Sequence, residues 1–142
     1  MREAITHCLW LGNALEARDV SVVLRLGVVA IVDLAMEEPA IHFPRDIVYC
    51  RIPLVAGSGN RPEIIRAAVE LTASFIDSRV PTLVACGAGM SRSPIIVAAA
   101  LSRVDGRSLE QALDDITMGV AHDVSTSLWA ETKAVCDGWP DD

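Results

Sequence analysis

The chain has 142 residues, a length typical of one domain, so we expect residues 1–142 to fold as a single unit that buries its own core. About half of the residues are apolar (51%), but no uncharged apolar run approaches the roughly 20 residues of a membrane span. We therefore expect a soluble, cytoplasmic protein with no export signal. The net charge of −7 argues against binding to nucleic acid or anionic membranes, which requires basic surfaces.

The first half of the chain predicts strands separated by one helix and by turns. Residues 8–11 read as a short strand, and residues 14–26 read as one helix that stops at Gly27. Residues 28–34 form an almost continuous apolar run, which is typical of a buried strand. Residues 47–55 are the next strand candidate.

The second half predicts helices around one more strand. A helix begins at Pro62, where proline suits the first turn, and its apolar stripe continues to about residue 77. Residues 81–85 then predict a strand, and the remaining expected helices span residues 92–103, 109–118 and 125–136. Because strands and helices alternate, the sequence predicts an α/β fold with a mostly parallel sheet and helices on both faces. Ligands of such sheets collect at the carboxyl ends of the strands.

The loop after the strand at residues 81–85 has the composition of an anion site. Between Cys86 and Arg92 lie mostly small residues, whose backbone N–H groups can converge on a phosphate without obstruction. We predict phosphate contacts from Gly87, Ala88, Gly89, Met90, Ser91 and Arg92. The helix that follows adds unpaired N–H groups and the positive end of its dipole.

Cys86 and Arg92 are the residues of this loop that carry chemistry. Arg92 is the only charged residue between Val80 and Leu101, and a lone guanidinium in so apolar a stretch needs an anionic partner, such as a bound oxyanion. The same electropositive surroundings lower the pKa of Cys86, and the hydroxyl of Ser93 can stabilise its thiolate. A thiolate aimed at a bound oxyanion suits attack on phosphorus and a phosphocysteine intermediate.

The segment from Cys86 to Pro94 resembles the signature loop of the dual-specificity phosphatases, within the protein tyrosine phosphatase superfamily, where a cysteine and an arginine flank five residues. Residues 5–13, 24–32 and 108–112 also resemble this family, so the likeness covers nearly the whole chain. The resemblance implies a four- or five-stranded sheet flanked by helices. It also implies that Cys86 is the nucleophile, that Arg92 clamps the phosphate, and that Ser93 helps the thiolate to leave in the second step.

Two positions depart from the family pattern. The residue before the nucleophile is usually His and is Ala85 here, which should alter the cysteine pKa without abolishing the loop. The family's general acid is an Asp after an Ile-Pro strand end, and the alignment of that pattern places Ala56 at its position. No carboxylate occurs between Asp46 and Glu63. We therefore identify no general acid.

Other residues are weaker candidates for that proton. Glu63 is the first of them because it is nearest to the expected loop, although each is more often a solvated surface charge. The further candidates are Glu37, Glu38, Asp123 and His122. No Cys or His has metal-ligand spacing, so we expect no metal and no cofactor. A regulatory disulfide between Cys86 and Cys50 depends on a distance that the sequence does not give.

Three functions remain at this point. The first is a phosphatase of reduced activity on a phosphorylated protein or a small phosphomonoester, with aryl esters such as phosphotyrosine preferred because a phenol leaves without much help. The second is a catalytically silent phosphate- or phosphoprotein-binding module. The third is another thiol chemistry on a similar loop, such as sulfur transfer or arsenate reduction. The sequence does not indicate an oligomeric state.

Overall fold

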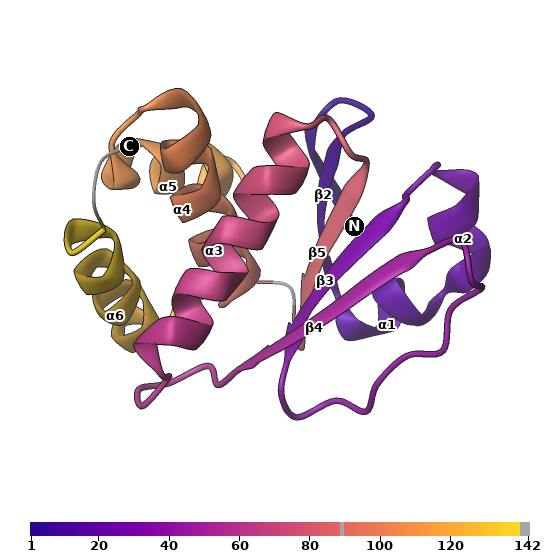
Figure 1. Cartoon of the computed structure of the whole chain (residues 1–142), viewed down its shortest axis with the longest axis horizontal. Helices are drawn as coiled ribbons and strands as arrows, with labels where there is room; N and C mark the ends of the chain where they lie inside the picture. Colours follow the sequence, from indigo (N-terminus) through magenta and orange to yellow (C-terminus); the bar gives the residue numbers. More distant parts are fainter. Residues whose placement is uncertain (89, 140–142) are drawn as a thin grey trace.

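A computed structural model describes residues 1–88 and 90–139, and its centre is a five-stranded sheet with the order β1-β2-β5-β3-β4 (Figure 1). The strands are β1 (Arg2–Ile5), β2 (Leu9–Asn13), β3 (Ala30–Ala35), β4 (Val48–Leu54) and β5 (Thr82–Cys86). β2, β5, β3 and β4 are parallel to one another, and only β1 is antiparallel to its neighbour. The mostly parallel α/β fold expected from the sequence is therefore confirmed.

The sequence analysis missed β1, and the reason is its position at the edge of the sheet. β3 and β5 are buried along their whole length, so they read as apolar runs. β1 contains Arg2 and Glu3, has no buried position and gives no such run. A tight turn with His7 at a positive φ of 57° brings β1 back against β2.

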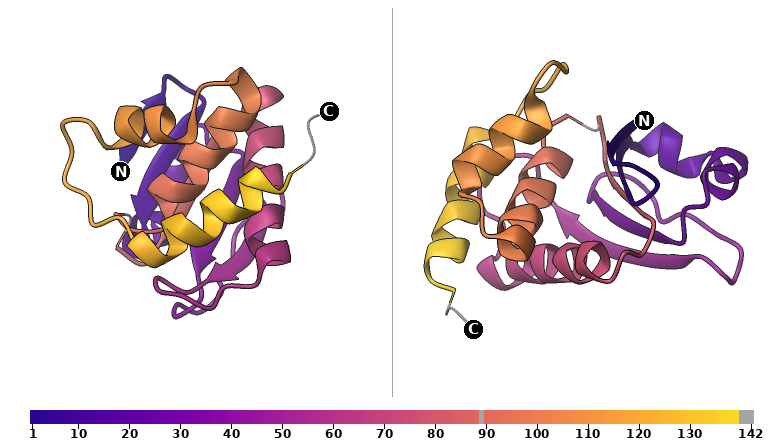
Figure 2. Two further views of the ribbon diagram at one scale, coloured as in Figure 1. Left: turned by 90° about the vertical axis from the view of Figure 1, so that its left-hand side faces the viewer. Right: turned by 90° about the horizontal axis from the view of Figure 1, so that it is seen from above.

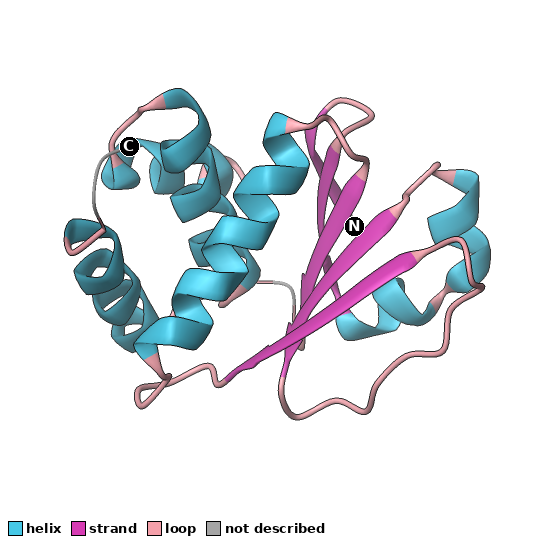
Figure 3. Ribbon diagram, viewed as in Figure 1, coloured by secondary structure: helices cyan, strands magenta, loops and turns pink. Residues whose placement is uncertain are grey.

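Helices cover both faces of the sheet in three layers (Figures 2 and 3). The helices are α1 (Ala14–Arg18), α2 (Val20–Arg25), α3 (Pro62–Asp77), α4 (Ser93–Asp105), α5 (Leu109–Thr117) and α6 (Thr126–Asp137). α1 and α2 pack on one face, where Ala17 and Val23 join a small core with Ile31 and Leu83. The other four helices lie on the opposite face and build the larger core around α4.

The helix predicted over residues 14–26 is wrong as a single element, because it is two short helices that meet at Asp19. Asp19 has non-helical backbone angles (φ −78°, ψ 79°), and its carboxylate accepts a hydrogen bond from the backbone N–H of Val22. Aspartate is a preferred N-cap residue, so Asp19 starts a new helix rather than continuing the old one. Asn13 and Glu16 form a capping box at the start of α1.

α4 links the core to the carboxyl edge of the sheet. Every residue from Ser93 to Leu101 is buried, and α3 and α5 pack against it. Its amino end therefore lies directly beyond the end of β5, at the edge where β2, β3 and β4 also end. Among residues 1–88 and 90–139, no helix combines the length and apolar character that crossing a bilayer demands.

Candidate active site

The loop between β5 and α4 begins at Cys86, the last residue of β5, and ends where α4 starts at Ser93. Its backbone is fixed from outside at two points. The Gly87 carbonyl accepts a hydrogen bond from the Ala14 N–H at 3.1 Å, and the Met90 carbonyl accepts one from the Asp123 N–H at 3.0 Å. Gly89, a predicted phosphate contact, lies outside the described residues. The loop is thus held by both α1 and the segment between α5 and α6.

Cys86 is fully buried, and its surroundings favour the thiolate. Burial by itself raises the pKa of the thiol. The nearby Ser93 hydroxyl and the backbone N–H groups of Ser93, Arg92 and Ser91 favour the thiolate, outweigh that effect and hold the pKa of Cys86 below its ordinary value. Burial raises the pKa of Cys50 and is the largest cause of the raised pKa of Cys136, so Cys86 is chemically distinct from these two thiols.

The guanidinium of Arg92 is 3% exposed and is held in one orientation. Its Nη1 donates to the Leu54 carbonyl at 2.7 Å and to Glu37 Oε1 at 2.7 Å, and its Nη2 donates to Glu37 Oε2 at 2.5 Å. The Nε of Arg92 is buried and has no hydrogen-bond partner among the described residues. A buried N–H without a partner is costly, so this edge of the guanidinium is the one that a bound oxyanion can satisfy.

Glu37 is the residue that the sequence analysis did not place correctly. We expected a bound oxyanion to be the partner of Arg92, yet the protein itself provides a carboxylate that binds the outer edge of the guanidinium. This carboxylate is 54% exposed, and its hydrogen bond with Arg92 lowers its pKa. A signal was present in the sequence, because Glu37 follows the end of β3 and the ends of parallel strands meet at one edge.

Gly87 makes room for this ion pair. A Cβ atom at position 87 would lie 2.7 Å from Glu37 Oε2 and 2.9 Å from Arg92 Nη2, closer than real Cβ contacts. Any larger residue would therefore displace the carboxylate or the guanidinium. Gly87 therefore leaves space for the Arg92 side chain, and it also leaves the backbone N–H groups of the loop accessible to a ligand.

The loop after β4, where the general acid was expected, is exposed from Ala56 to Gly59 and carries no carboxylate of its own. Asn60 organises it, since its amide accepts a hydrogen bond from the Val55 N–H and donates to the Val55 and Gly57 carbonyls. Glu131 of α6 anchors the same loop by accepting from the N–H of Gly59 at 2.8 Å. The loop therefore has a defined shape without an acid at Ala56.

Of the substitute acids from the sequence analysis, Glu37 binds Arg92 in this loop, whereas Glu63, Glu38 and Asp123 make other contacts. Glu63 pairs with Arg61 on the first turn of α3, and hydrogen bonds with backbone N–H groups and Arg61 lower its pKa, which makes it a weaker proton donor. Glu38 lies 3.7 Å from Arg18. Asp123 contacts the loop only through its backbone N–H.

Comparison with solved structures gives close matches over almost the whole chain. Human DUSP28 is 19% identical, with 96% of each chain covered and a TM-score of 0.82. DUSP15 is 25% identical over 97% of this chain and 88% of its own, with a TM-score of 0.73. A human tyrosine phosphatase-like serine/threonine/tyrosine-interacting protein is 18% identical over 94% and 93%, with a TM-score of 0.79. No protein-family model and no curated protein sequence matches the chain.

This is the dual specificity phosphatase fold. The resemblance seen in the sequence is thereby confirmed at the level of the structure, and so is the five-stranded sheet flanked by helices that it implied. Within this fold, Cys86, Arg92 and Ser93 lie where β5 passes into α4.

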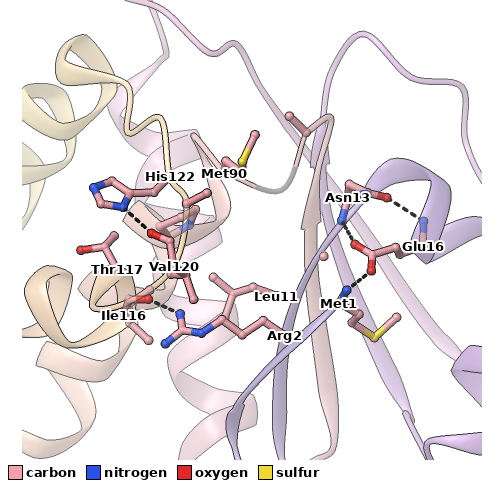
Figure 4. Close-up of a pocket in the computed structure, with 14 residues that line it drawn as sticks. Met1, Arg2, Leu11, Asn13, Glu16, Met90, Ile116, Thr117, Val120 and His122 are labelled. Carbon is pink, nitrogen blue, oxygen red and sulfur yellow. Dashed lines mark hydrogen bonds and ion pairs between the residues drawn. The ribbon is translucent and has the colours of Figure 1, made fainter.

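A pocket of about 230 Å³ flanks the phosphatase loop on the side of β1 and β2 (Figure 4). It contains His122, whose Nδ1 lies 3.0 Å from the Val120 carbonyl, together with Met90 of the loop. Arg2 also faces this pocket, but its guanidinium donates to the carbonyl of Ile116 near the end of α5. His122 thus lies beside the loop, while Arg2 already serves as a helix cap.

The topology of this dual specificity phosphatase fold separates Cys50 from Cys86. In register, Val84 of β5 pairs with Val32 of β3, and Val32 pairs with Cys50 of β4. Two strand spacings of about 4.8 Å put Cys50 roughly 10 Å from Val84, and Cys86 lies two residues further along β5. A disulfide needs Cα atoms within about 7 Å, so the bond considered from the sequence is excluded in this conformation.

Proposed function

We propose that the protein is a cysteine-dependent phosphatase that hydrolyses phosphomonoesters through a phosphocysteine intermediate. In the first step the Cys86 thiolate attacks phosphorus, the bond to the leaving oxygen breaks, and that oxygen takes a proton from solvent. In the second step water attacks phosphorus, the sulfur–phosphorus bond breaks, and phosphate is released. The Ser93 hydroxyl stabilises the thiolate that returns.

The observation that carries this proposal is the free edge of Arg92. A buried Nε without a partner among the described residues lies in the same loop as a thiol with a lowered pKa. An oxyanion bound there satisfies the Nε, and it meets the first turn of α4, which has no side-chain cap. Both features support a site for a tetrahedral oxyanion next to a sulfur nucleophile.

The loop after β4 supports a preference for aryl esters. General acid catalysis contributes about 10² to 10⁴ in rate, and its absence affects basic leaving groups most. A phenol with a pKa near 10 leaves more readily than an alkyl alcohol. We therefore propose phosphotyrosine or another aryl phosphate ahead of phosphoserine, and a phosphocysteine that accumulates because Ala56 cannot act as a base for water either.

A second candidate is a silent module that binds phosphate or phosphoprotein without hydrolysing it. The absence of a carboxylate at Ala56 favours it, as does the firm anchoring of that loop by Asn60 and Glu131. The structural neighbours support both candidates, since they include phosphatases and a phosphatase-like interacting protein.

The test is hydrolysis of 4-nitrophenyl phosphate by the wild type and by Cys86→Ser. We expect turnover by the wild type with an initial burst of nitrophenol, and a loss of about 10⁴-fold or more in the variant. Cys136→Ser is the matched control, because Cys136 lies on α6 away from the loop and its pKa is raised by burial.

Tungstate binding separates the two candidates. Binding to Cys86→Ser together with turnover by the wild type supports the phosphatase. Binding without any wild-type turnover supports the silent module. If tungstate does not bind to either protein, both candidates fail.

A further inference from the structure

A second pocket, of about 370 Å³, is lined by residues from the segment after β3, from the end of β4 with the loop that follows it, and from the start of α3. Its apolar walls are Met36, Pro53, Val55 and Ile64. Met36 is 47% exposed, so part of its apolar side chain is open to a ligand. The pocket therefore presents apolar surface to whatever occupies the site.

Three walls of this pocket adjoin, along the chain, the residues that bind Arg92. Pro53 and Val55 flank Leu54, whose carbonyl accepts from Arg92 Nη1 at 2.7 Å. Met36 precedes Glu37, whose carboxylate binds both Nη atoms. Consecutive Cα atoms are about 3.8 Å apart, so these wall residues lie one residue from Leu54 and Glu37, which both bind the guanidinium of Arg92. A molecule whose phosphate is bound by Arg92 can reach the pocket with its next few atoms.

The polar groups around this pocket are already engaged. The Asn60 amide is used by the backbone of its own loop, and Arg61 pairs with Glu63. The pocket in Figure 4 differs, because charged groups of Arg2 and Glu16 lie within it. Of these two pockets, the one beside β4 has the more apolar walls, and such a surface favours an apolar occupant.

We propose that this pocket binds the apolar body of the leaving group, so that the preferred substrate is an aryl phosphomonoester with a hydrophobic extension on its ring. The inference rests on the proposed phosphatase function and adds the specificity-determining residues Met36, Pro53, Val55 and Ile64. Two separate features converge on this class of substrate. The loop without an acid requires a weakly basic phenol, and the neighbouring pocket accommodates an apolar ring substituent.

The test compares phenyl phosphate with 4-butylphenyl phosphate, whose leaving groups have nearly equal basicity but differ in apolar length. Each buried methylene is worth about a factor of four in affinity, so we expect kcat/KM to be about tenfold or more higher for the butyl compound. Equal values for the two substrates would overturn the inference while leaving the phosphatase function intact.

Two methionine variants locate the effect. Met36→Gln should reduce the ratio of the two kcat/KM values about threefold or more, because a polar amide replaces part of the apolar wall. Met118→Gln is the matched control, since Met118 is 68% exposed and lies outside this pocket, and it should keep the wild-type ratio. A ratio lowered equally by both variants would contradict the assignment of Met36.

A binding measurement keeps the inference separate from catalysis. Calorimetry on Cys86→Ser with benzylphosphonate and 4-butylbenzylphosphonate reports the pocket without turnover. We expect the butyl compound to bind about tenfold more tightly. Equal affinities would reject the pocket alone, whereas no binding of either phosphonate would reject the proposed function together with it.

Discussion

The loop after β5 runs from buried Cys86 to buried Arg92, and its backbone is tied to α1 and to the segment before α6. The loop after β4 reaches the same edge of the sheet but is exposed from Ala56 to Gly59 and is tied to α6 through Asn60 and Glu131. Both loops have defined shapes. They differ in that the first carries groups suited to bind and attack a phosphate, while the second lacks the carboxylate that moves a proton.

In the proposed function, nucleophilic attack and proton transfer belong to separate parts of the chain. The nucleophile loop depends on burial and on backbone N–H groups, which many side chains around it support. The proton-transfer function depends on a single exposed side chain, and replacing that side chain leaves the fold untouched. The comparison therefore predicts that changes in the first loop abolish function and that changes in the second loop modulate it.

The largest expected effect comes from Arg92→Lys. Lysine keeps the charge but loses the planar fork that bonds Glu37, the Leu54 carbonyl and an oxyanion together. We expect kcat/KM for 4-nitrophenyl phosphate to fall about 10³-fold and tungstate binding to weaken strongly. Retention of wild-type tungstate affinity in Arg92→Lys would show that the Nε edge is not the oxyanion site.

Restoring the acid should sharpen the comparison. Ala56→Asp places a carboxylate at the position where the resemblance expects one, and we predict a gain of about 10- to 100-fold for an alkyl phosphate such as phosphoserine. The gain should be much smaller for 4-nitrophenyl phosphate, whose leaving group needs no proton. Ser58→Asp adds the same charge to the same exposed loop and is the control that should give no gain.

Thiol reactivity tests the nucleophile loop by itself. Because the pKa of Cys86 is lowered while the pKa of Cys50 is raised, iodoacetamide at pH 6.5 should alkylate Cys86 first. A thiol with a lowered pKa forms its thiolate at lower pH. The alkylation rate should therefore rise at a lower pH for Cys86 than for Cys50. Ser93→Ala removes one stabilising hydrogen bond and should slow alkylation of Cys86 at pH 6.5 by about tenfold, as followed by peptide mass spectrometry.

The smallest effect concerns the ion pair between Arg92 and Glu37, which lies in the segment after β3. Glu37→Gln removes a negative charge beside Arg92, so phosphate should bind the Cys86→Ser background about three- to tenfold more tightly, because like charges repel. Glu38→Gln is the neighbouring control, since the Glu38 carboxylate lies 3.7 Å from the guanidinium of Arg18. Weaker phosphate binding in Glu37→Gln would instead assign Glu37 to the orientation of Arg92.

Much of the fold was predictable because the central parallel strands β3 and β5 are buried along their whole length. β3 and β5 read as apolar runs, Pro62 marked the start of α3, and the helix expected from residue 109 is α5. The break at Asp19 was not expected, because the apolar spacing on either side of it is helical. The Asp19 carboxylate accepts a hydrogen bond from the Val22 N–H, and this local contact ends one helix and starts the next despite the helical spacing.

The sequence by itself determined the phosphate loop, because small residues, a cysteine, a lone arginine and a buried helix follow one another within a few positions. The sequence also shows directly that position 56 is Ala and carries no carboxylate. Only the tertiary structure decided that Glu37 binds Arg92, that Glu131 anchors a loop 71 residues away, and that Cys50 is too far from Cys86. These relations join segments that are distant along the chain, and local patterns carry no information about distances that the packing of strands and helices sets.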